Sequence, residues 1–318
     1  MTGFTFRPAT RENVGLLIGL AGSSGSGKTY TAMRLAKGIA GDKPFCVIDT
    51  EAGRAKHYAD AFKFDHGDLK PPFSPSAYAD AIRAADDAHY PVIVVDSMSH
   101  EHAGDGGILD MQEAEFQRMG AREAVKMSSW IKPKGEHRRM VSRLLQVRAH
   151  LILCFRAEEK VEMVRKEVDG KMKMVVQKKE TATGLDGWQP ICEKNLPYEL
   201  TASFLLMAAR PGVPLPIKLQ EQHKALFPLD APINEQSGES LARWAAGGGE
   251  GASRSPVAPA AASAPTPDEF ALLVKAREHA ETGTEKYAAW FKALTAAERK
   301  MIGTERHEEF KVIAKAAS

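Results

Sequence analysis

The chain has few cysteines, little net charge and no long apolar run, and each shortage excludes a class of protein. Its three cysteines, Cys46, Cys154 and Cys192, have the spacing of neither a disulfide framework nor a metal site. Two of them lie in apolar segments, which predicts buried thiols in a reducing, cytoplasmic setting. The formal net charge is only +2, so any surface that attracts nucleic acid must be local.

Features of membrane and secreted proteins are also missing. No apolar run approaches the roughly 20 residues that a membrane-spanning helix needs. The N-terminus, Met1–Phe4, lacks the basic and then apolar layout of a secretory signal. We therefore expect no membrane partner. The 318 residues are enough for one substantial domain and a smaller appendage.

One motif carries specific chemistry, the segment Gly22–Thr29. It fits the pattern G-x-x-x-x-G-K-[ST] of a phosphate-binding P-loop, with an apolar run, Val14–Leu20, before it and a helical pattern, Thr31–Ala36, after it. This strand–loop–helix context distinguishes a P-loop from a flexible Gly/Ser turn. The expected nucleotide-binding residues are Gly22, Ser23, Ser24, Gly25, Ser26, Gly27, Lys28 and Thr29.

The residue types of this loop predict binding of ATP and Mg²⁺. Glycines let successive backbone N–H groups turn toward phosphate oxygens, and the following helix directs its positive end at the same anion. Lys28 would reach the β- and γ-phosphates. The Thr29 hydroxyl would bind Mg²⁺.

The first 210 residues alternate apolar strands with helical stretches, which predicts an α/β fold with a mostly parallel sheet. The runs are continuously apolar, as in strands covered on both faces. Segments 161–165 and 171–176 alternate around Val168–Lys171, and the Asp169-Gly170 between them indicates a hairpin. We also expect a helix capped by Ser76, a helix over much of 120–149, strands at 197–207 and 213–218, and a short helix near 239–245.

Composition divides the chain into three parts. We expect an ATPase core at residues 1–246 and a disordered linker rich in Gly, Ala, Ser and Pro at 247–267. Residues 268–318 predict a small all-α module of about three helices. One of these helices has a capping box at Thr295–Glu298.

Acidic side chains end two of the predicted strands. Asp96 follows the apolar run 92–95, as in a Walker B strand that holds Mg²⁺, although an Asp can also merely end a strand. Glu51 follows the run 45–49, on a strand that we expect beside the P-loop strand. There it would polarise a water in line with the γ-phosphate. The alternative is a solvated Glu that opens a loop.

These residues resemble the RecA-type recombinase ATPases, and more closely the phage-encoded RecA-like ATPases that include single-strand annealing proteins of the Sak type. The resemblance covers roughly residues 4–246. Its motifs, besides the P-loop and Asp96, are Ile48–Arg54, the basic segment Trp130–Arg148, Cys154–Arg156, and Leu226–Pro228 followed by Trp244.

The resemblance implies roles for several residues. Glu51 and Lys28 would be catalytic, Thr29 and Asp96 would hold the metal, and Arg156 would sense the γ-phosphate, unless it forms a structural ion pair. ATP would bind between subunits of a homo-oligomer, with Lys178 and Lys179 as candidates for cations supplied to a neighbour's site. The setting would be the cytoplasm of a bacterial host.

A local basic cluster is the candidate DNA-binding surface. Between Arg118 and Arg148 there are nine Lys and Arg residues against two acids. The expected DNA-binding residues are Lys132, Lys134, Arg138, Arg139 and Arg143. Trp130 could stack on a base, but packing in the core is favoured. The hairpin 158–180 holds seven basic residues against six acids, so its charge alone does not support DNA contact.

We therefore expect a Mg²⁺-dependent, DNA-stimulated ATPase that acts on single-stranded DNA in phage recombination or annealing. The C-terminal helices would recruit DNA or a single-stranded DNA-binding protein. Three alternatives share the P-loop: a helicase loader or other DNA motor, a small-molecule kinase, and a nucleotide-switched assembly factor with negligible turnover. A kinase would need a lid, and no arginine-rich lid pattern is present.

Overall fold

The computed structural model describes residues 15–168, 171–179, 185, 187–247 and 267–316. The chain divides into two compact units, Met1–Gly248 and Gly249–Ser318. The predicted linker, residues 247–267, lies outside the described residues except at its two ends. Among the described residues, no helix combines the length and the apolarity that crossing a membrane requires.

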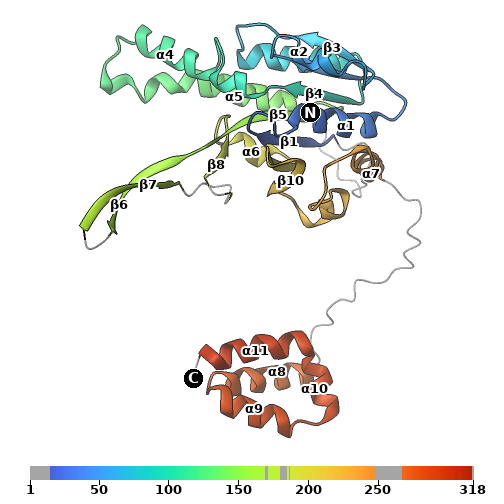
Figure 1. The fold of residues 1–318 in the computed structure, drawn as a ribbon, viewed down its shortest axis with the longest axis vertical. Coiled ribbons are helices and arrows are strands. Elements are labelled where there is room, and N and C mark those ends of the chain that lie inside the picture. The colour runs from blue at the N-terminus through green and yellow to red at the C-terminus, as the bar shows by residue number, and fades with distance from the viewer. Residues whose placement is uncertain (1–14, 169–170, 180–184, 186, 248–266, 317–318) are drawn as a thin grey trace, which may run out of the picture. The chain divides into compact units, whose positions relative to one another are not determined.

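The first unit is built on a mostly parallel sheet, which confirms the predicted α/β class (Figure 1). The strand order is β10-β9-β1-β5-β4-β2-β3, and β8 pairs with the far end of β5. Among the described strands of this sheet, only β8 and β10 run antiparallel to their partners. The strands are β1 (Leu17–Gly22), β2 (Phe45–Asp49), β3 (Phe64–Asp68), β4 (Val92–Asp96), β5 (His150–Glu159), β8 (Trp188–Pro190), β9 (Ala202–Met207) and β10 (Arg210–Lys218).

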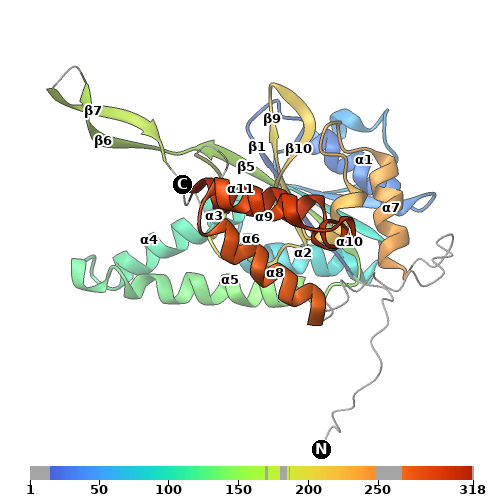
Figure 2. The ribbon, with the colours of Figure 1, turned by 90° about the horizontal axis from the view of Figure 1, so that it is seen from below.

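Helices cover both faces of this sheet, which explains the continuous apolarity of its strands. Alternate residues of β1 enter different core clusters: Ile18 packs with α1 (Lys28–Ala40), and Leu17 with α2 (Pro75–Asp87). The helix α7 (Glu235–Ala245) belongs to the cluster of α1. The helix α5 (Ile131–Leu144) packs beside α2 in the other cluster (Figure 2).

Shorter elements complete the unit. They are η1 (Arg54–Tyr58), α3 (Ser99–Ala103), α4 (Ile108–Arg118), η2 (Glu123–Val125), η3 (Ser128–Trp130), α6 (Leu196–Glu199) and η4 (Glu221–Leu226).

Three of the expectations from the sequence need correction. Ser74 rather than Ser76 caps α2, because Pro75 suits the first helical position and the Ala77 N–H bonds to the Ser74 hydroxyl at 3.3 Å. The segment 120–149 is helical only in part, since α4 ends before Gly120 at φ +88° and α5 begins at Ile131. The segment 197–207 begins with α6, so its strand starts at Ala202.

The predicted hairpin is formed by β6 (Val161–Val168) and β7 (Lys171–Lys178), paired antiparallel with Val168 opposite Lys171. Residues 169 and 170, the expected turn, lie outside the described residues. The hairpin is a separate two-stranded sheet that extends away from the main sheet in both views (Figures 1 and 2).

The second unit contains four helices among its described residues, rather than about three. They are α8 (Pro267–Ala280), α9 (Thr284–Ala293), α10 (Ala296–Ile302) and α11 (Thr304–Ala316). Gly303, at φ +75°, ends α10 before the next helix starts, a break that composition alone conceals. The capping box at Thr295 and Glu298 is confirmed. Tyr287 and Ile302 are central to its core.

Two glycines allow α1 and α7 to cross at very short range. A Cβ atom on Gly38 would lie 1.9 Å from the Glu235 carbonyl oxygen, and one on Gly238 would lie 2.3 Å from the Leu35 carbonyl oxygen. Beside the crossing, the Arg34 guanidinium donates to both oxygens of the Glu235 carboxylate, with distances of 2.6 to 3.1 Å. The crossing places the C-terminal helix of this unit against the helix that follows the P-loop.

We predict that Gly38→Ala destabilises the first unit by about 2 kcal/mol or more, because the added methyl group must push the backbone of α7 away. Gly135→Ala is the matched control. It also lies within a helix, but its Cβ would meet only the Arg139 guanidinium, at 3.8 Å. We expect the control to be neutral or stabilising by up to about 1 kcal/mol. Urea unfolding of both variants measures this, and equal stability of Gly38→Ala and wild type would contradict the close crossing.

Candidate nucleotide-binding site

The carboxyl ends of four parallel strands meet at one edge of the sheet. Strand register pairs Gly22 with Arg156, Asp96 with Cys154, and Asp49 with Asp96. The P-loop and the predicted Walker B acid therefore lie where strands end beside β5, and the predicted sensor, Arg156, lies on β5 within two residues of their level. Ligands of parallel α/β sheets bind at this edge, because the loops that leave it are free to vary.

Side chains of the P-loop form hydrogen bonds with the loop's own backbone. The Ser26 hydroxyl donates to the Ser23 carbonyl oxygen at 2.8 Å, and the Lys28 ammonium donates to the same oxygen at 2.8 Å. Gly25 and Gly27 have φ values of +77° and +83°, which favour glycine. Of the described side chains, none caps the N-terminus of α1, and no acid lies in its first turn. The backbone N–H groups at this helix start suit a phosphate.

Thr29 and Asp96 lie in direct contact. The Thr29 hydroxyl donates to Oδ2 of Asp96 at 2.5 Å, so the first turn of α1 is joined to the end of β4. Burial raises the pKa of Asp96, while the Thr29 hydrogen bond and the Lys28 charge oppose the rise. A hydroxyl and a carboxylate side by side fit Mg²⁺, which prefers oxygen ligands and keeps several waters and phosphate oxygens around it.

Lys28 faces the same space from the start of α1. Burial lowers the pKa of its ammonium group, and the negative charges of Asp96 and Glu51 act in the opposite direction. A partly desolvated cation attracts the oxygens of a triphosphate more strongly than an exposed lysine does, because little water competes. The geometry therefore suits Lys28 for phosphate binding.

These residues border one cavity of about 760 Å³. This volume lies in the range of small-molecule and cofactor pockets. Its lining includes the P-loop except Ser26, together with Asp49, Glu51, Asp96 and Arg156. The side chain of Ser26 is fully buried, and its hydrogen bond to the Ser23 carbonyl oxygen stabilises the loop. The structure thus brings together the residues that were predicted for nucleotide, metal, catalysis and sensing.

Glu51 reaches this cavity although its strand is not beside the P-loop strand. The sequence-based expectation of a neighbouring strand was wrong, because β5 and β4 lie between β1 and β2. Two residues hold the loop in place. The Asp49 carboxylate accepts from the N–H groups of Glu51 at 2.6 Å and Ala55 at 2.9 Å. The Thr50 hydroxyl accepts from the Ser97 N–H at 2.8 Å, directly after Asp96.

The Glu51 carboxylate is held between two arginines. Oε1 accepts from the Arg156 guanidinium at 2.8 and 3.1 Å, and Oε2 accepts from Arg54 at 2.8 Å. Burial raises the pKa of Glu51, but the hydrogen bonds and charges of Arg156 and Arg54 outweigh it, so the pKa lies below its ordinary value. Glu51 is therefore ionised at neutral pH, as a proton acceptor must be.

Sequence reasoning missed the positioning roles of Asp49 and Thr50. Asp49 is 1% exposed and also lies 3.2 Å from Nε2 of His66. The sequence does indicate a role for Asp49, because a carboxylate at the end of an apolar strand needs buried hydrogen-bond partners. Thr50 also contacts Nδ1 of His100 at 2.7 Å. Nothing in the local pattern indicates this contact, because it joins residues 50 positions apart.

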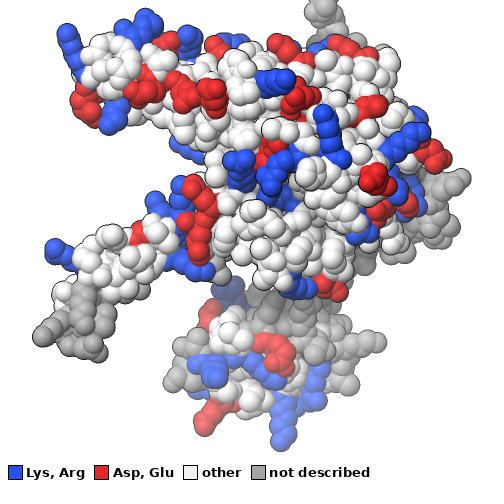
Figure 3. All heavy atoms as spheres, turned by 45° about the horizontal axis from the view of Figure 1, so that its top comes forward, with Lys and Arg blue, Asp and Glu red and all other residues white. Residues whose placement is uncertain are grey.

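Most residues of the predicted DNA-binding cluster already have acidic partners. Lys132 pairs with Glu115 at 2.8 Å, Arg139 with Glu136 at 3.8 Å, and Arg143 with Asp80 at 2.6 Å. Among the described residues, Lys134 and Arg138 have no ion pair. Figure 3 likewise shows Lys and Arg interspersed with Asp and Glu on the face drawn, rather than one continuous basic surface.

Trp130 does not lie in the core, where the sequence favoured it. It is half-buried at the end of η3, and the Lys134 ammonium lies 5.6 Å from its ring centroid. The neighbouring Ser129 takes the buried position instead. A lysine over a partly exposed indole leaves this side chain available at the surface near the start of α5.

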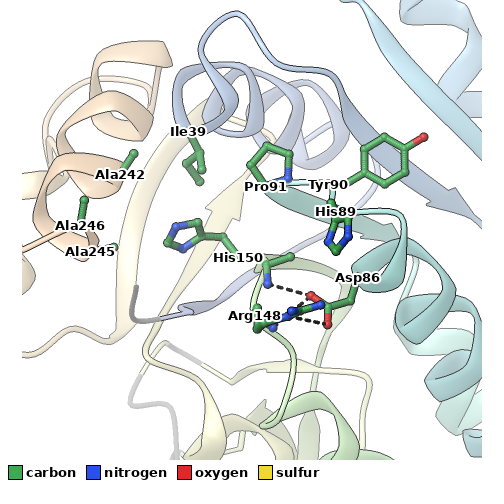
Figure 4. A pocket seen from close by; sticks show the side chains of 11 residues that line it. Ile39, Asp86, His89, Tyr90, Pro91, Arg148, His150, Ala242, Ala245 and Ala246 are labelled. Carbon is green, nitrogen blue, oxygen red and sulfur yellow. Dashed lines mark hydrogen bonds and ion pairs between the residues drawn. The ribbon is translucent and has the colours of Figure 1, made fainter. Parts of the chain in front are cut away.

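A smaller cavity of about 330 Å³ lies at the opposite edge of the sheet, before β4 and β5 begin (Figure 4). Its acid, Asp86, accepts from the backbone N–H groups of Arg148 and Ala149, each at 3.1 Å, and lies 3.7 Å from the Arg148 guanidinium. Because these contacts satisfy the carboxylate, Asp86 joins the end of α2 to the turn before β5. The arrangement is structural.

Comparison with known proteins places much of the first unit in a known family. A family model described as an AAA domain matches residues 15–188, a span from β1 through the start of β8 that contains the P-loop, Glu51, Asp96 and Arg156. The search of curated proteins finds no match.

We predict that Lys28→Ala weakens nucleotide binding by at least about tenfold, because it removes the only lysine that lines the described part of the cavity. Lys37→Ala is the matched control, an exposed lysine on the same helix and away from the cavity. Titration with a fluorescent ATP analogue measures both. Wild-type affinity in Lys28→Ala would contradict the assignment of the P-loop.

Proposed function

The chain belongs to the AAA-domain family of P-loop ATPases, and we propose that it hydrolyses ATP with Mg²⁺ to act on single-stranded DNA in phage recombination or annealing. Within this family, the resemblance to RecA-like phage proteins of the Sak type supplies the finer part of the proposal. The observation that carries the hydrolytic part is the placement of an ionised Glu51 in one cavity with Lys28, Thr29 and Asp96.

The chain's own residues divide the work. The P-loop N–H groups and the Lys28 ammonium bind the triphosphate, and Thr29 and Asp96 would hold the metal. When bound, Mg²⁺ would neutralise charge on the phosphate oxygens. Glu51 accepts the proton of the attacking water, because its low pKa keeps it ionised and Asp49 positions its backbone.

Arg156 suits the role of a sensor in this scheme. Its backbone is paired with Gly22, its N–H donates to the Ser99 hydroxyl at 2.9 Å, and its guanidinium bonds to Glu51. The half-exposed guanidinium lines the same cavity as the P-loop, so a γ-phosphate can compete with Glu51 for it. Binding of ATP would then release the catalytic carboxylate toward water.

A homo-oligomer is part of the proposal, and the hairpin supports it. Five of its large apolar side chains are more than half exposed. The β6–β7 register places all five on one face of the hairpin. They are Val161, Met163, Met172, Met174 and Val176. We propose that this face packs on a neighbouring subunit, which would bring Lys178 and Lys179 toward that subunit's nucleotide.

Single-stranded DNA is proposed as the polymer on which the ATPase acts. Lys134, Arg138 and the half-buried Trp130 offer two cations and an aromatic ring near the start of α5, a combination suited to phosphates and bases. The C-terminal helices would recruit a partner such as a single-stranded DNA-binding protein.

We predict that single-stranded DNA stimulates ATP hydrolysis, and that the double variant Lys134→Ala/Arg138→Ala binds it about tenfold more weakly. Loss of two phosphate contacts should also reduce the slope of log affinity against log salt by about 1.4, because each contact with a single strand contributes about 0.7. Lys43→Ala/Lys63→Ala is the control, since these exposed lysines border a different cavity at the N-terminal side of β2 and β3. Fluorescence anisotropy with a labelled oligonucleotide at several salt concentrations gives both values.

The outcomes distinguish the rivals. ATP turnover that ignores DNA but requires a small-molecule acceptor would replace the proposal with a kinase. Binding of ATP without turnover would indicate an assembly factor. Stimulation by DNA with no annealing of complementary strands would favour a helicase loader or another motor.

A further inference from the structure

The C-terminal unit contains a cavity that the ATPase assignment does not use. It has a volume of about 670 Å³ and lies among α9, α10 and α11. Its apolar lining includes Tyr287, Ala288 and Phe291, and its cations come from all three helices. They are Lys292, Arg299, Lys311 and Lys315.

The charge of this lining is one-sided although the unit is neutral. From Asp268 onward the sequence contains nine acids and nine Lys or Arg residues. Four of those cations border the cavity, and no acid does so among the described residues. Lys311 pairs with Glu308 at 2.7 Å, but Lys292 and Lys315 have no ion pair in the described part of the chain. An anionic partner would therefore meet little competition here.

The aromatic rings that line the cavity already contact other side chains of the unit. The ring of His307 stacks on Phe291 with centroids 3.7 Å apart, and the Arg299 guanidinium lies 6.0 Å from the Phe291 centroid. Tyr287 is 2% exposed. A nucleic-acid base stacks on an exposed ring face, and the contacts of Phe291 and His307 and the burial of Tyr287 do not favour such stacking. An aliphatic or aromatic side chain can instead fill the apolar hollow from its open side.

From these observations we propose that the cavity binds an acidic peptide segment carrying one large apolar side chain. The apolar side chain enters the hollow beside Phe291, and the carboxylates of the segment face Lys292 and Lys315. The proposal goes beyond the ATPase function and does not depend on it. It gives the C-terminal unit the role of a docking module for a protein partner with an acidic segment.

The test uses the full chain without ATP or DNA. The probe is a short fluorescent peptide with a run of aspartates followed by phenylalanine. We expect saturable binding, followed by anisotropy, that is lost when the aspartates are replaced by asparagine and also when the phenylalanine is replaced by serine. We expect Lys292→Ala/Lys315→Ala to weaken binding by about fivefold at low salt.

Two further variants make the result specific. Lys275→Ala/Lys286→Ala removes two exposed lysines of the same unit that do not line the cavity, and it should bind the peptide as wild type does. Ala288→Phe adds a ring at an exposed position of the lining and should compete with the peptide side chain. Circular dichroism confirms that each variant is folded.

Binding that ignores the phenylalanine, or equal effects of the two lysine pairs, would overturn the proposal in favour of nonspecific charge attraction. Preference of this unit for a single-stranded oligonucleotide, abolished by Lys292→Ala/Lys315→Ala, would overturn it in favour of nucleic acid. ATP hydrolysis should be unchanged in all of these variants. Failure of the docking proposal is therefore distinguishable from failure of the ATPase proposal.

Discussion

The nucleotide site depends on the register of four parallel strands, three of which end beside the fourth, β5. Because β1, β4 and β2 end beside β5, which continues past them to Glu159, Gly22, Arg156, Asp96 and Asp49 are neighbours without any long loop to bring them together. The buried strand bodies hold these ends rigidly, since both faces of the sheet are covered. A change in strand order would separate Glu51 from Arg156, although neither residue would change its local structure.

The same edge of the sheet places three carboxylates in a largely buried setting, and each carboxylate has a different kind of hydrogen-bond partner. Asp49 receives backbone N–H groups, Asp96 receives the Thr29 hydroxyl, and Glu51 receives two guanidinium groups. Asp49 thereby positions the backbone of Glu51, and Asp96 faces the Thr29 hydroxyl. The Glu51 carboxylate is held by two arginine side chains, which can move. The arginines lie at the boundary with solvent, where a phosphate can exchange with a carboxylate at modest cost.

Much of this could be predicted from local sequence, and the rest depends on tertiary contacts. The P-loop and the strand before Asp96 have short-range patterns, and the continuous apolarity of the strands indicates a sheet covered on both sides. The link between Glu51 and Arg156 joins residues 105 positions apart and depends on strand order, which a single sequence does not specify. Counting charges from 118 to 148 overstated the basic surface, because Glu115 and Asp80, which lie outside that segment, neutralise part of it. The basic cavity of the C-terminal unit was hidden for the converse reason, since its composition is balanced overall.

The central claim is that Glu51 performs the water chemistry in a site that otherwise only binds ATP. Single-turnover hydrolysis of ATP with Mg²⁺ by Glu51→Gln tests it most directly, with Glu199→Gln, an exposed glutamate on α6, as the control. The account predicts that Glu51→Gln retains ATP affinity within about threefold of wild type and loses at least about 100-fold in hydrolysis rate. The control should hydrolyse at the wild-type rate. Hydrolysis by Glu51→Gln at the wild-type rate would contradict the account.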